Sequence, residues 1–194
     1  MWWKTTQNTL PLGSKILSII LYSDATNCDT LGKSQLHPIY LSLRNIPTWR
    51  RNKQDAKQLL GYLPIIKSAS GVTKQKARQT FHNCLKIILE PIQLYSEAGI
   101  NLLINNKYIW FFPKISTIIA DWPEAATFCL TYKSASSNYP CYFCLVNKEN
   151  LANLKLTKHD LKLRNHENML NYYNMNKENT VCIESVQNIF WKFK

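Results

Sequence analysis

Two aspartates follow apolar stretches that are far apart along the chain. Asp24 follows the run "ILSIILYS", and Asp121 follows "KISTIIA". Apolar runs of this kind are typical of strands that are covered on both faces and lie centrally in a sheet. Carboxylates at the ends of two adjacent strands would bind Mg²⁺ or Mn²⁺, which can activate an attacking oxygen in phosphodiester chemistry. The alternative interpretation is a turn-forming or helix-capping aspartate at each position.

A second candidate site is the segment "YPCYFCLV", in which Cys141 and Cys144 have C-x-x-C spacing. Two cysteines at this distance can bind one zinc ion, but tetrahedral zinc requires two further ligands. The downstream candidates, His159, His166 and Cys182, do not have a compact zinc-finger spacing. A redox pair and buried, incidental cysteines remain alternatives.

The charge of the chain is strongly and unevenly basic. Lys and Arg number 24 against 12 Asp and Glu, a net charge of +12. Residues 44–86 hold ten of these cations and the single acid Asp55. This excess indicates a polyanionic partner, nucleic acid first and an anionic membrane second, and the alternative is a solvated face. The candidate DNA-binding residues are Arg44, Arg50, Arg51 and Lys53, with Tyr40, Trp49 and Tyr62 interleaved for base stacking or for core packing.

Length and composition indicate a folded, intracellular protein. The 194 residues suit one domain with a small appendage, and an apolar share of 45% predicts a packed core. The longest apolar runs are much shorter than the roughly 20 residues of a membrane-spanning helix. The first residues lack the apolar core of a secretory signal, so we expect no membrane association and no secretion.

Periodicity predicts an α/β domain with a mixed sheet. A polar connection around Gly32 should follow the first strand, and a turn at Asn105 and Asn106 should join two short strands. Pro91 should kink or split the long helix, and Gly99 should end it. Residues 56–66 could form a strand or a short helix, and Gly61 and Pro64 favour the strand. The predicted order is strand 16–23, strand 37–47, strand 56–66, helix 73–98, a hairpin within 100–113, strand 114–120 and a helix that opens at Pro123.

Several segments together resemble a known family. In order along the chain they are "ILYSDAT", "LGKSQLHPIYLSLRNIP", "GYLP", "IIADWPE" and "CYFC". This combination resembles the Plavaka-type DNA transposases of fungal genomes, which are relatives of the Kyakuja, Dileera and Zisupton elements. The similarity extends from about residue 14 to the C-terminus.

The resemblance implies an RNase H-like catalytic fold that cuts and joins DNA with three acidic residues and a divalent metal. Asp24 matches the first acid, Asp121 matches the second, and Cys141 with Cys144 matches a zinc-knuckle-like pair in an insertion. It further implies DNA as the partner, together with self-association or binding to other transposase chains. The expected location is the nucleus, otherwise the cytoplasm. The expected divisions are a catalytic core at 14–132, the C-x-x-C insertion at 133–180 and a C-terminal tail at 181–194.

The third acid is where this sequence departs from the family pattern. In the family it lies well beyond the insertion, after a stretch similar to "SVQNIFWKF". We therefore expect a transposase fragment whose fold is incomplete at the C-terminus and which has little or no strand-transfer activity. The alternatives are a non-catalytic nucleic-acid-binding remnant and a zinc-stabilised interaction module. The acids that precede the expected position are Glu149, Glu167, Glu178 and Glu184.

Overall fold

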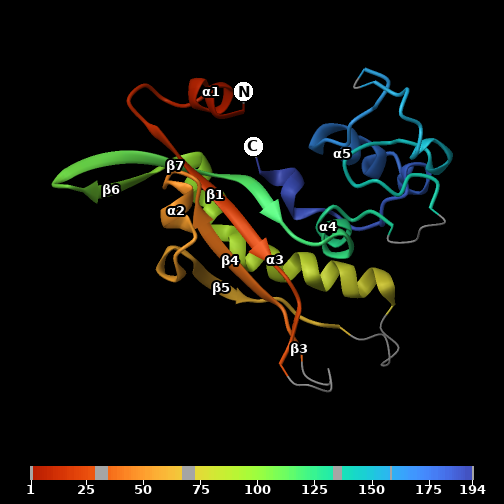
Figure 1. Cartoon of the computed structure of the whole chain (residues 1–194), viewed down its shortest axis with the longest axis horizontal. Helices are drawn as coiled ribbons and strands as arrows, with labels where there is room; N and C mark the ends of the chain where they lie inside the picture. Colours follow the sequence, from red (N-terminus) through yellow and green to blue (C-terminus); the bar gives the residue numbers. More distant parts are fainter. Residues whose placement is uncertain (1, 29–34, 67–72, 133–136, 158, 194) are drawn as a thin grey trace. The chain divides into compact units, whose positions relative to one another are not determined.

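The computed structural model describes residues 2–28, 35–66, 73–132, 137–157 and 159–193. These residues form two compact units, each discontinuous in sequence (Figure 1). The first unit comprises residues 1–65, 85–120 and 193–194, and the second comprises residues 66–84 and 121–192. Each unit is described separately below.

A five-stranded mixed sheet forms the first unit, in the order β5-β4-β1-β7-β6. The central strand β1 pairs antiparallel with β4 and parallel with β7. This arrangement confirms the predicted mixed α/β architecture. The strands are β1 (Lys15–Ser23), β4 (Pro38–Leu43), β5 (Gln58–Tyr62), β6 (Ile100–Ile104) and β7 (Lys107–Ile119).

The apolar run before Asp24 is the central strand, as its composition predicts. Ile16 and Leu21 of β1 are fully buried, and so is Ile39 of the neighbouring strand β4. Central strands lose solvent on both faces, which is why β1 is apolar almost throughout. The predicted strand at 56–66 is also present as β5, although it is shorter.

The segment 100–120 differs from the prediction of a hairpin followed by a separate strand. β7 is one strand of 13 residues that continues through Pro113. β6 pairs with β7 only as far as Phe111, and from that residue onward β7 pairs with β1. Proline is tolerated there because, among the described residues, no strand continues the ladder on the β6 side of β7 beyond Phe111. The predicted turn is confirmed, since Asn105 and Asn106 have φ values of 50° and 59°.

A β-bulge interrupts the pairing of β1 with β7. Ile19 pairs with Ile115, but the next residue, Ile20, pairs with Thr117. The extra residue is Ser116, whose hydroxyl donates to the Ile19 carbonyl over 2.9 Å. From this point the paired residues of the two strands are 97 positions apart in sequence, as in Tyr22 with Ile119 (119 − 22 = 97).

The long helix α3 (Lys74–Ala98) is continuous, so the prediction that Pro91 could split it is wrong. Proline removes the hydrogen bond to the carbonyl four residues earlier, that of Ile87, a residue that is 71% exposed and can be solvated. Gly99 ends the helix as predicted, with φ at +73°. Within the first unit, Ile88 of α3 lies 3.7 Å from the position that a Cβ on Gly61 of β5 would take.

Short elements complete the first unit. The connection after Asp24 is a two-stranded hairpin in which Thr26 pairs with Leu36, and the predicted pivot Gly32 lies outside the described residues. None of the described helices is long and apolar enough to cross a bilayer. The elements are α1 (Trp2–Asn8), β2 (Thr26–Asn27), β3 (Gln35–Leu36), α2 (Thr48–Arg51) and the 3₁₀ turn η1 (Gln54–Ala56).

The second unit is built mainly of short helices and loops. Met169, Val181 and Ile183 form a small buried cluster, and Trp191 packs against it. Two isolated bridges, Thr131 with Ile183 and Cys144 with Leu163, connect distant segments. Besides the start of α3, its helices are α4 (Trp122–Phe128) and α5 (His166–Asn174), with 3₁₀ turns η3 (Lys148–Asn150), η4 (Glu178–Val181) and η5 (Ile189–Lys192).

Two buried polar side chains of the second unit form hydrogen bonds with backbone groups of other segments of the same unit. His82 of α3 lies 3.2 Å by Nε2 from the Thr127 carbonyl, and its Nδ1 accepts from the Ile189 N–H over 3.4 Å. The Asn188 amide donates to the Phe128 carbonyl over 2.8 Å and accepts from the Phe190 N–H over 2.9 Å. Because Nδ1 accepts a hydrogen bond it carries no proton, and Nε2–H is left to donate to the Thr127 carbonyl. A second proton, on Nδ1, would break the bond from Ile189, so the neutral imidazole fits this site.

Candidate functional site

Asp24 and Asp121 follow the same end of two adjacent parallel strands. The last pair of the β1–β7 ladder is Tyr22 with Ile119, and each aspartate comes two residues later in its own segment. The sequence separation of the acids (121 − 24 = 97) equals the pairing offset that the bulge at Ser116 creates. Without the bulge, position 24 would correspond to Ala120.

The local environments of the two carboxylates differ. Asp24 is exposed, and its Oδ2 accepts from the Tyr22 hydroxyl over 3.1 Å. Asp121 is the N-cap of α4, where its Oδ1 accepts from the Glu124 N–H over 2.8 Å. The structure therefore confirms the helix-capping interpretation for Asp121. The second oxygen of a capping carboxylate remains available to a cation.

The C-x-x-C segment forms a compact turn in the second unit. The Cys141 sulfur accepts from the Phe143 N–H over 3.3 Å, and burial raises the pKa of the Cys144 thiol, against the effect of the Val146 N–H. Backbone N–H groups that point at sulfur stabilise the thiolate form that binds metals. Two sulfur atoms can supply half of a zinc site, and the thiol of Cys144, which burial favours, would lose its proton on binding the ion.

Among the described residues, the candidate zinc ligands beyond the C-x-x-C pair are not gathered into one group. Within the part of the chain that the structure describes, no group of three or more His, Cys, Asp or Glu side chains could hold a metal ion. His159 and His166 are both exposed. Cys182 is buried in the second unit, and its thiol is an electrostatic neighbour of Arg164, as are those of Cys129, Cys141 and Cys144.

Arg164 holds the C-x-x-C turn in place, a role that the sequence does not reveal. Its Nε donates to the Cys141 carbonyl over 2.9 Å and its Nη2 to the Tyr139 carbonyl over 3.0 Å. Its backbone N–H donates to the Phe143 carbonyl over 2.8 Å. Burial lowers the pKa of the guanidinium, which nevertheless stays charged. A single arginine among many basic residues has no sequence signal of this function.

An exposed aromatic cluster borders Asp121 in the same unit. The Trp122 ring meets the Tyr142 ring edge-on at 4.8 Å, and the Tyr142 and Phe143 centroids are 4.3 Å apart. Trp122 is 52% exposed and Phe143 is 64% exposed. The contact connects the C-x-x-C turn to the start of α4 and therefore has a packing function.

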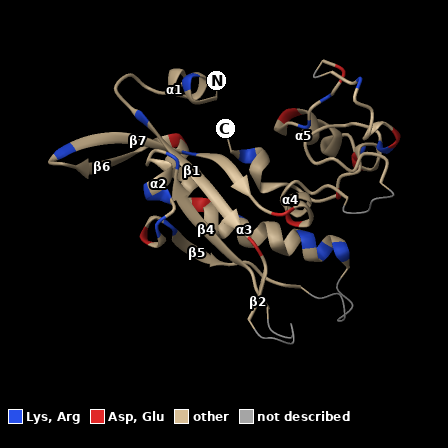
Figure 2. Cartoon of the chain, viewed as in Figure 1, with Lys and Arg blue, Asp and Glu red and all other residues tan. Residues whose placement is uncertain are grey.

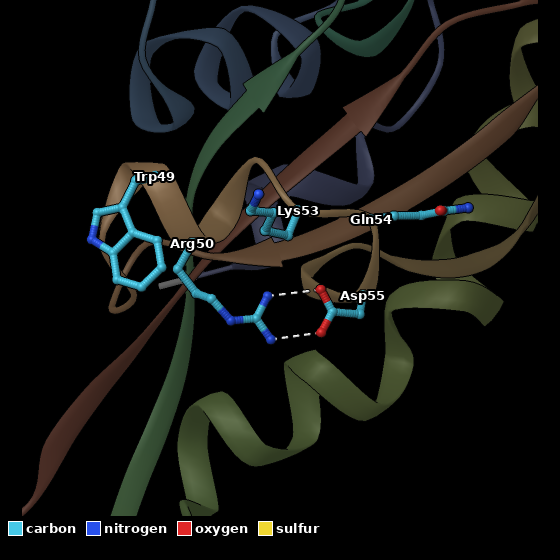
Figure 3. Close-up of a pocket in the computed structure, with 5 residues that line it drawn as sticks. All are labelled: Trp49, Arg50, Lys53, Gln54 and Asp55. Carbon is cyan, nitrogen blue, oxygen red and sulfur yellow. Dashed lines mark hydrogen bonds and ion pairs between the residues drawn. The ribbon is translucent and has the colours of Figure 1, made fainter.

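The basic segment displays cations on α2, on the turn that follows it and on the start of α3 (Figure 2). Arg50 makes a bidentate ion pair with Asp55, with N–O distances of 2.8 and 2.7 Å (Figure 3). The hydrogen-bonded ion pair lowers the pKa of the Asp55 carboxyl and raises the pKa of the Arg50 guanidinium. Arg51 donates to the Thr48 hydroxyl over 3.0 Å, while Arg44 and Lys53 are exposed.

The order of these segments agrees with a comparison against protein families. The model of the Plavaka transposase family matches residues 1–193. This chain belongs to the Plavaka transposase family. A search of curated proteins gave no match. Membership of the Plavaka family makes this a transposase-derived protein, for which an interaction with DNA is implied.

Proposed function

We propose that this Plavaka chain carries an RNase H-like transposase core, which binds DNA through its basic segment and holds a divalent cation with Asp24 and Asp121. The observation that supports this proposal is the register of β1 and β7. Parallel neighbours place the ends of both strands at one edge of the sheet, where α/β proteins bind ligands. After the bulge at Ser116, the pairing offset of β1 and β7 is 97 residues, which equals the sequence separation of the two acids.

Mg²⁺ or Mn²⁺ is the cation that fits these donors. Carboxylate oxygens are hard ligands, and two carboxylates near one another repel unless a cation neutralises them. The cation, when bound, would supply Lewis-acid activation of a phosphodiester. The residues of this chain would orient it: Asp24 through the bond from Tyr22, and Asp121 through its fixed position as the N-cap of α4.

The basic segment is proposed to contact DNA phosphates. Lys53 and Arg44 are exposed cations, and Arg51 is half-buried beside Thr48. Arg50 would share its guanidinium between Asp55 and DNA. Phosphate contacts of this kind bind without reading sequence and weaken steeply with salt. Cys141 and Cys144 are proposed to bind Zn²⁺ as a structural ion, with the Phe143 N–H already donating to the Cys141 sulfur.

A DNA-binding chain without chemistry is the second candidate. It is favoured by the capping role of Asp121 and by the absence of a three-ligand metal group among the described residues. In this case the acids would be structural, and the basic segment alone would act.

A plasmid-nicking assay with Mg²⁺ or Mn²⁺ separates the two candidates. Asp24→Asn and Asp121→Asn each remove a charge, and asparagine keeps the N-cap at position 121, so the fold should survive. Asp160→Asn is the matched control, because Asp160 is an exposed carboxylate that bonds only to Thr157 in the described structure. We expect metal-dependent nicking in wild type and Asp160→Asn, and its loss in the other two variants.

Calorimetric titration with Mn²⁺ gives a readout that does not depend on turnover. Wild type and Asp160→Asn should bind the ion, and Asp24→Asn and Asp121→Asn should bind it at least tenfold more weakly. Equal Mn²⁺ binding by all four proteins would overturn the metal proposal. Salt-sensitive DNA binding in EDTA that persists in both acid variants, without nicking by wild type, would establish the second candidate.

A further inference from the structure

Trp49 is an exposed tryptophan on a turn that is otherwise well ordered by hydrogen bonds. It is 71% exposed, although tryptophan is usually largely buried. Among the described residues, no aromatic ring packs on its indole. Its flat apolar face and the cations beside it offer the two kinds of contact that an aromatic ligand with an anionic group would use.

The turn that carries Trp49 is held in shape from both sides. The Arg50 and Arg51 N–H groups both donate to the Pro47 carbonyl, over 3.1 and 2.9 Å. The Arg50–Asp55 ion pair then closes the chain between α2 and η1, and Figure 3 shows these two side chains pointing at one another, with the Trp49 ring apart from them. A ligand would meet a surface that needs little ordering, which favours affinity.

A shallow hollow of about 540 Å³ lies on this turn. Its walls are Trp49, Arg50, Lys53, Gln54 and Asp55 (Figure 3). The hollow combines one flat apolar face, one charge-neutral ion pair and one cation. In the described part of the chain, the Lys53 ammonium has no ion-pair partner. A planar ring on the indole, with an attached anion at Lys53, would satisfy both groups.

We propose that this hollow binds an unpaired nucleobase of DNA, which stacks on Trp49 while a neighbouring phosphate contacts Lys53. Arg50 and Asp55 are positioning residues that hold the turn. The base must be unpaired because a ring within a duplex has both faces covered by its neighbours. The inference rests on the proposed function only in taking DNA as the partner, and it does not involve the two acids.

The position in the fold makes this a binding site and not part of the metal site. β4 runs antiparallel to β1, with Ile39 opposite Ser23 and Leu43 opposite Ile19. The chain that leaves β4 therefore moves away from Asp24, and the Arg44 N–H donates to the Ser18 carbonyl near the middle of β1. Figure 1 shows α2 away from the arrowhead of β1. The hollow would therefore bind a DNA strand at a distance from the proposed metal site.

The test is fluorescence anisotropy of a labelled oligothymidine with the full chain in EDTA. Stacking of one base contributes about 1 to 3 kcal/mol, so Trp49→Ala should weaken binding roughly 5- to 150-fold. Trp49→Phe keeps an aromatic face and should remain within about threefold of wild type. Tyr108→Ala is the matched control, because Tyr108 is a 76% exposed aromatic residue of the same unit, and it should bind as wild type does.

Two further measurements distinguish stacking from general charge effects. An abasic oligomer of equal length and charge should bind wild type as weakly as it binds Trp49→Ala, since neither complex can stack a base. Lys53→Ala should reduce the slope of log affinity against log salt by about 0.7, whereas Trp49→Ala should leave that slope unchanged.

Each outcome decides the proposal. A Trp49→Ala loss that is equally large on the abasic oligomer would overturn it, as would wild-type affinity in Trp49→Ala. Trp49-dependent binding of anionic phospholipid vesicles without any Trp49 dependence on DNA would assign the hollow to a membrane surface instead. Duplex binding that is salt-sensitive but independent of Trp49 would leave the proposed function standing and remove only this inference.

Discussion

In each unit a helix is followed by a residue with positive φ, but this residue is glycine in the first unit and leucine in the second. In the first unit, α3 is followed by Gly99 at φ +73°, and in the second, α4 is followed by Leu130 at φ +56°. Glycine adopts this left-handed conformation without strain, whereas leucine does not. Leu130 is nevertheless fully buried, and its carbonyl accepts from the Glu184 N–H over 2.7 Å. Backbone preference determines the first helix end, and tertiary burial determines the second.

The same contrast extends to the rest of the two units. The first unit is held by backbone ladders between apolar strands, including the ladder between β1 and the distant β7, with Ile16 and Leu21 in its core. The second depends on polar side chains such as Arg164 and Asn188, which bond to backbone groups 23 to 60 residues away. Local periodicity predicts the individual strands that form these ladders, whereas no local pattern predicts the side-chain clamps.

Gly99→Ala should have the largest effect and tests the first helix end. A Cβ at this position would collide with the Trp110 indole and press on the Phe112 ring, in addition to the strain of positive φ. We expect a loss of roughly 3 to 4 kcal/mol in the free energy of unfolding, measured by urea denaturation. Gly13→Ala is the control, because Gly13 has φ at +83° but nothing within 4 Å of the new Cβ. It should cost only about 1 kcal/mol; equal losses in the two variants would contradict the steric explanation.

Substitutions at Leu130 test the second helix end and should have the next largest effect. Leu130→Ala removes a fully buried side chain and keeps the strained backbone, so we expect a loss of about 3 kcal/mol. Leu130→Gly loses slightly more buried surface but relieves strain of about 1 kcal/mol, so it should be at least as stable as Leu130→Ala. Urea denaturation of both variants gives the comparison. A clearly lower free energy of unfolding for Leu130→Gly than for Leu130→Ala would contradict the idea that burial of Leu130 offsets backbone strain.

The smallest of the three expected effects is a pH dependence of stability that is confined to the second unit. Burial lowers the pKa of His82 from 6.5 to about 4, and the charge of Arg78 lowers it further, against the bond to the Thr127 carbonyl. The folded state therefore favours the neutral ring, and its stabilisation is complete above pH 6.5 and is lost as the pH falls towards 4. From about pH 7.5 to about pH 5 we expect a loss of about 2 kcal/mol.

Hydrogen exchange at several pH values would locate this loss. Peptides from α4 and from the start of α3 should lose protection as the pH falls, while peptides from β1 and β7 should not. His82→Gln should be less stable at neutral pH but should show a flatter pH dependence, and His159→Gln, at an exposed position, should behave as wild type does. A uniform loss across both units would assign the acid sensitivity to other groups.

The sequence by itself determined strands β1, β4 and β5, the end of α3 at Gly99 and the turn at Asn105 and Asn106. These features follow from apolar periodicity and from residues that tolerate positive φ, both of which act over a few positions. Local pattern also located the basic segment, the C-x-x-C pair and the resemblance to the Plavaka family, which the family model confirms over residues 1–193.

Only the tertiary structure decided that β7 continues through Pro113, that a bulge at Ser116 sets the register of the two acids, and that Arg164 clamps the C-x-x-C turn. It also gave Arg50 a carboxylate partner and left Trp49 exposed. Each of these outcomes depends on contacts that a residue makes, or does not make, with segments that are distant in sequence. No periodicity carries that information, because a hydrogen bond between remote segments exists only once the chain has folded.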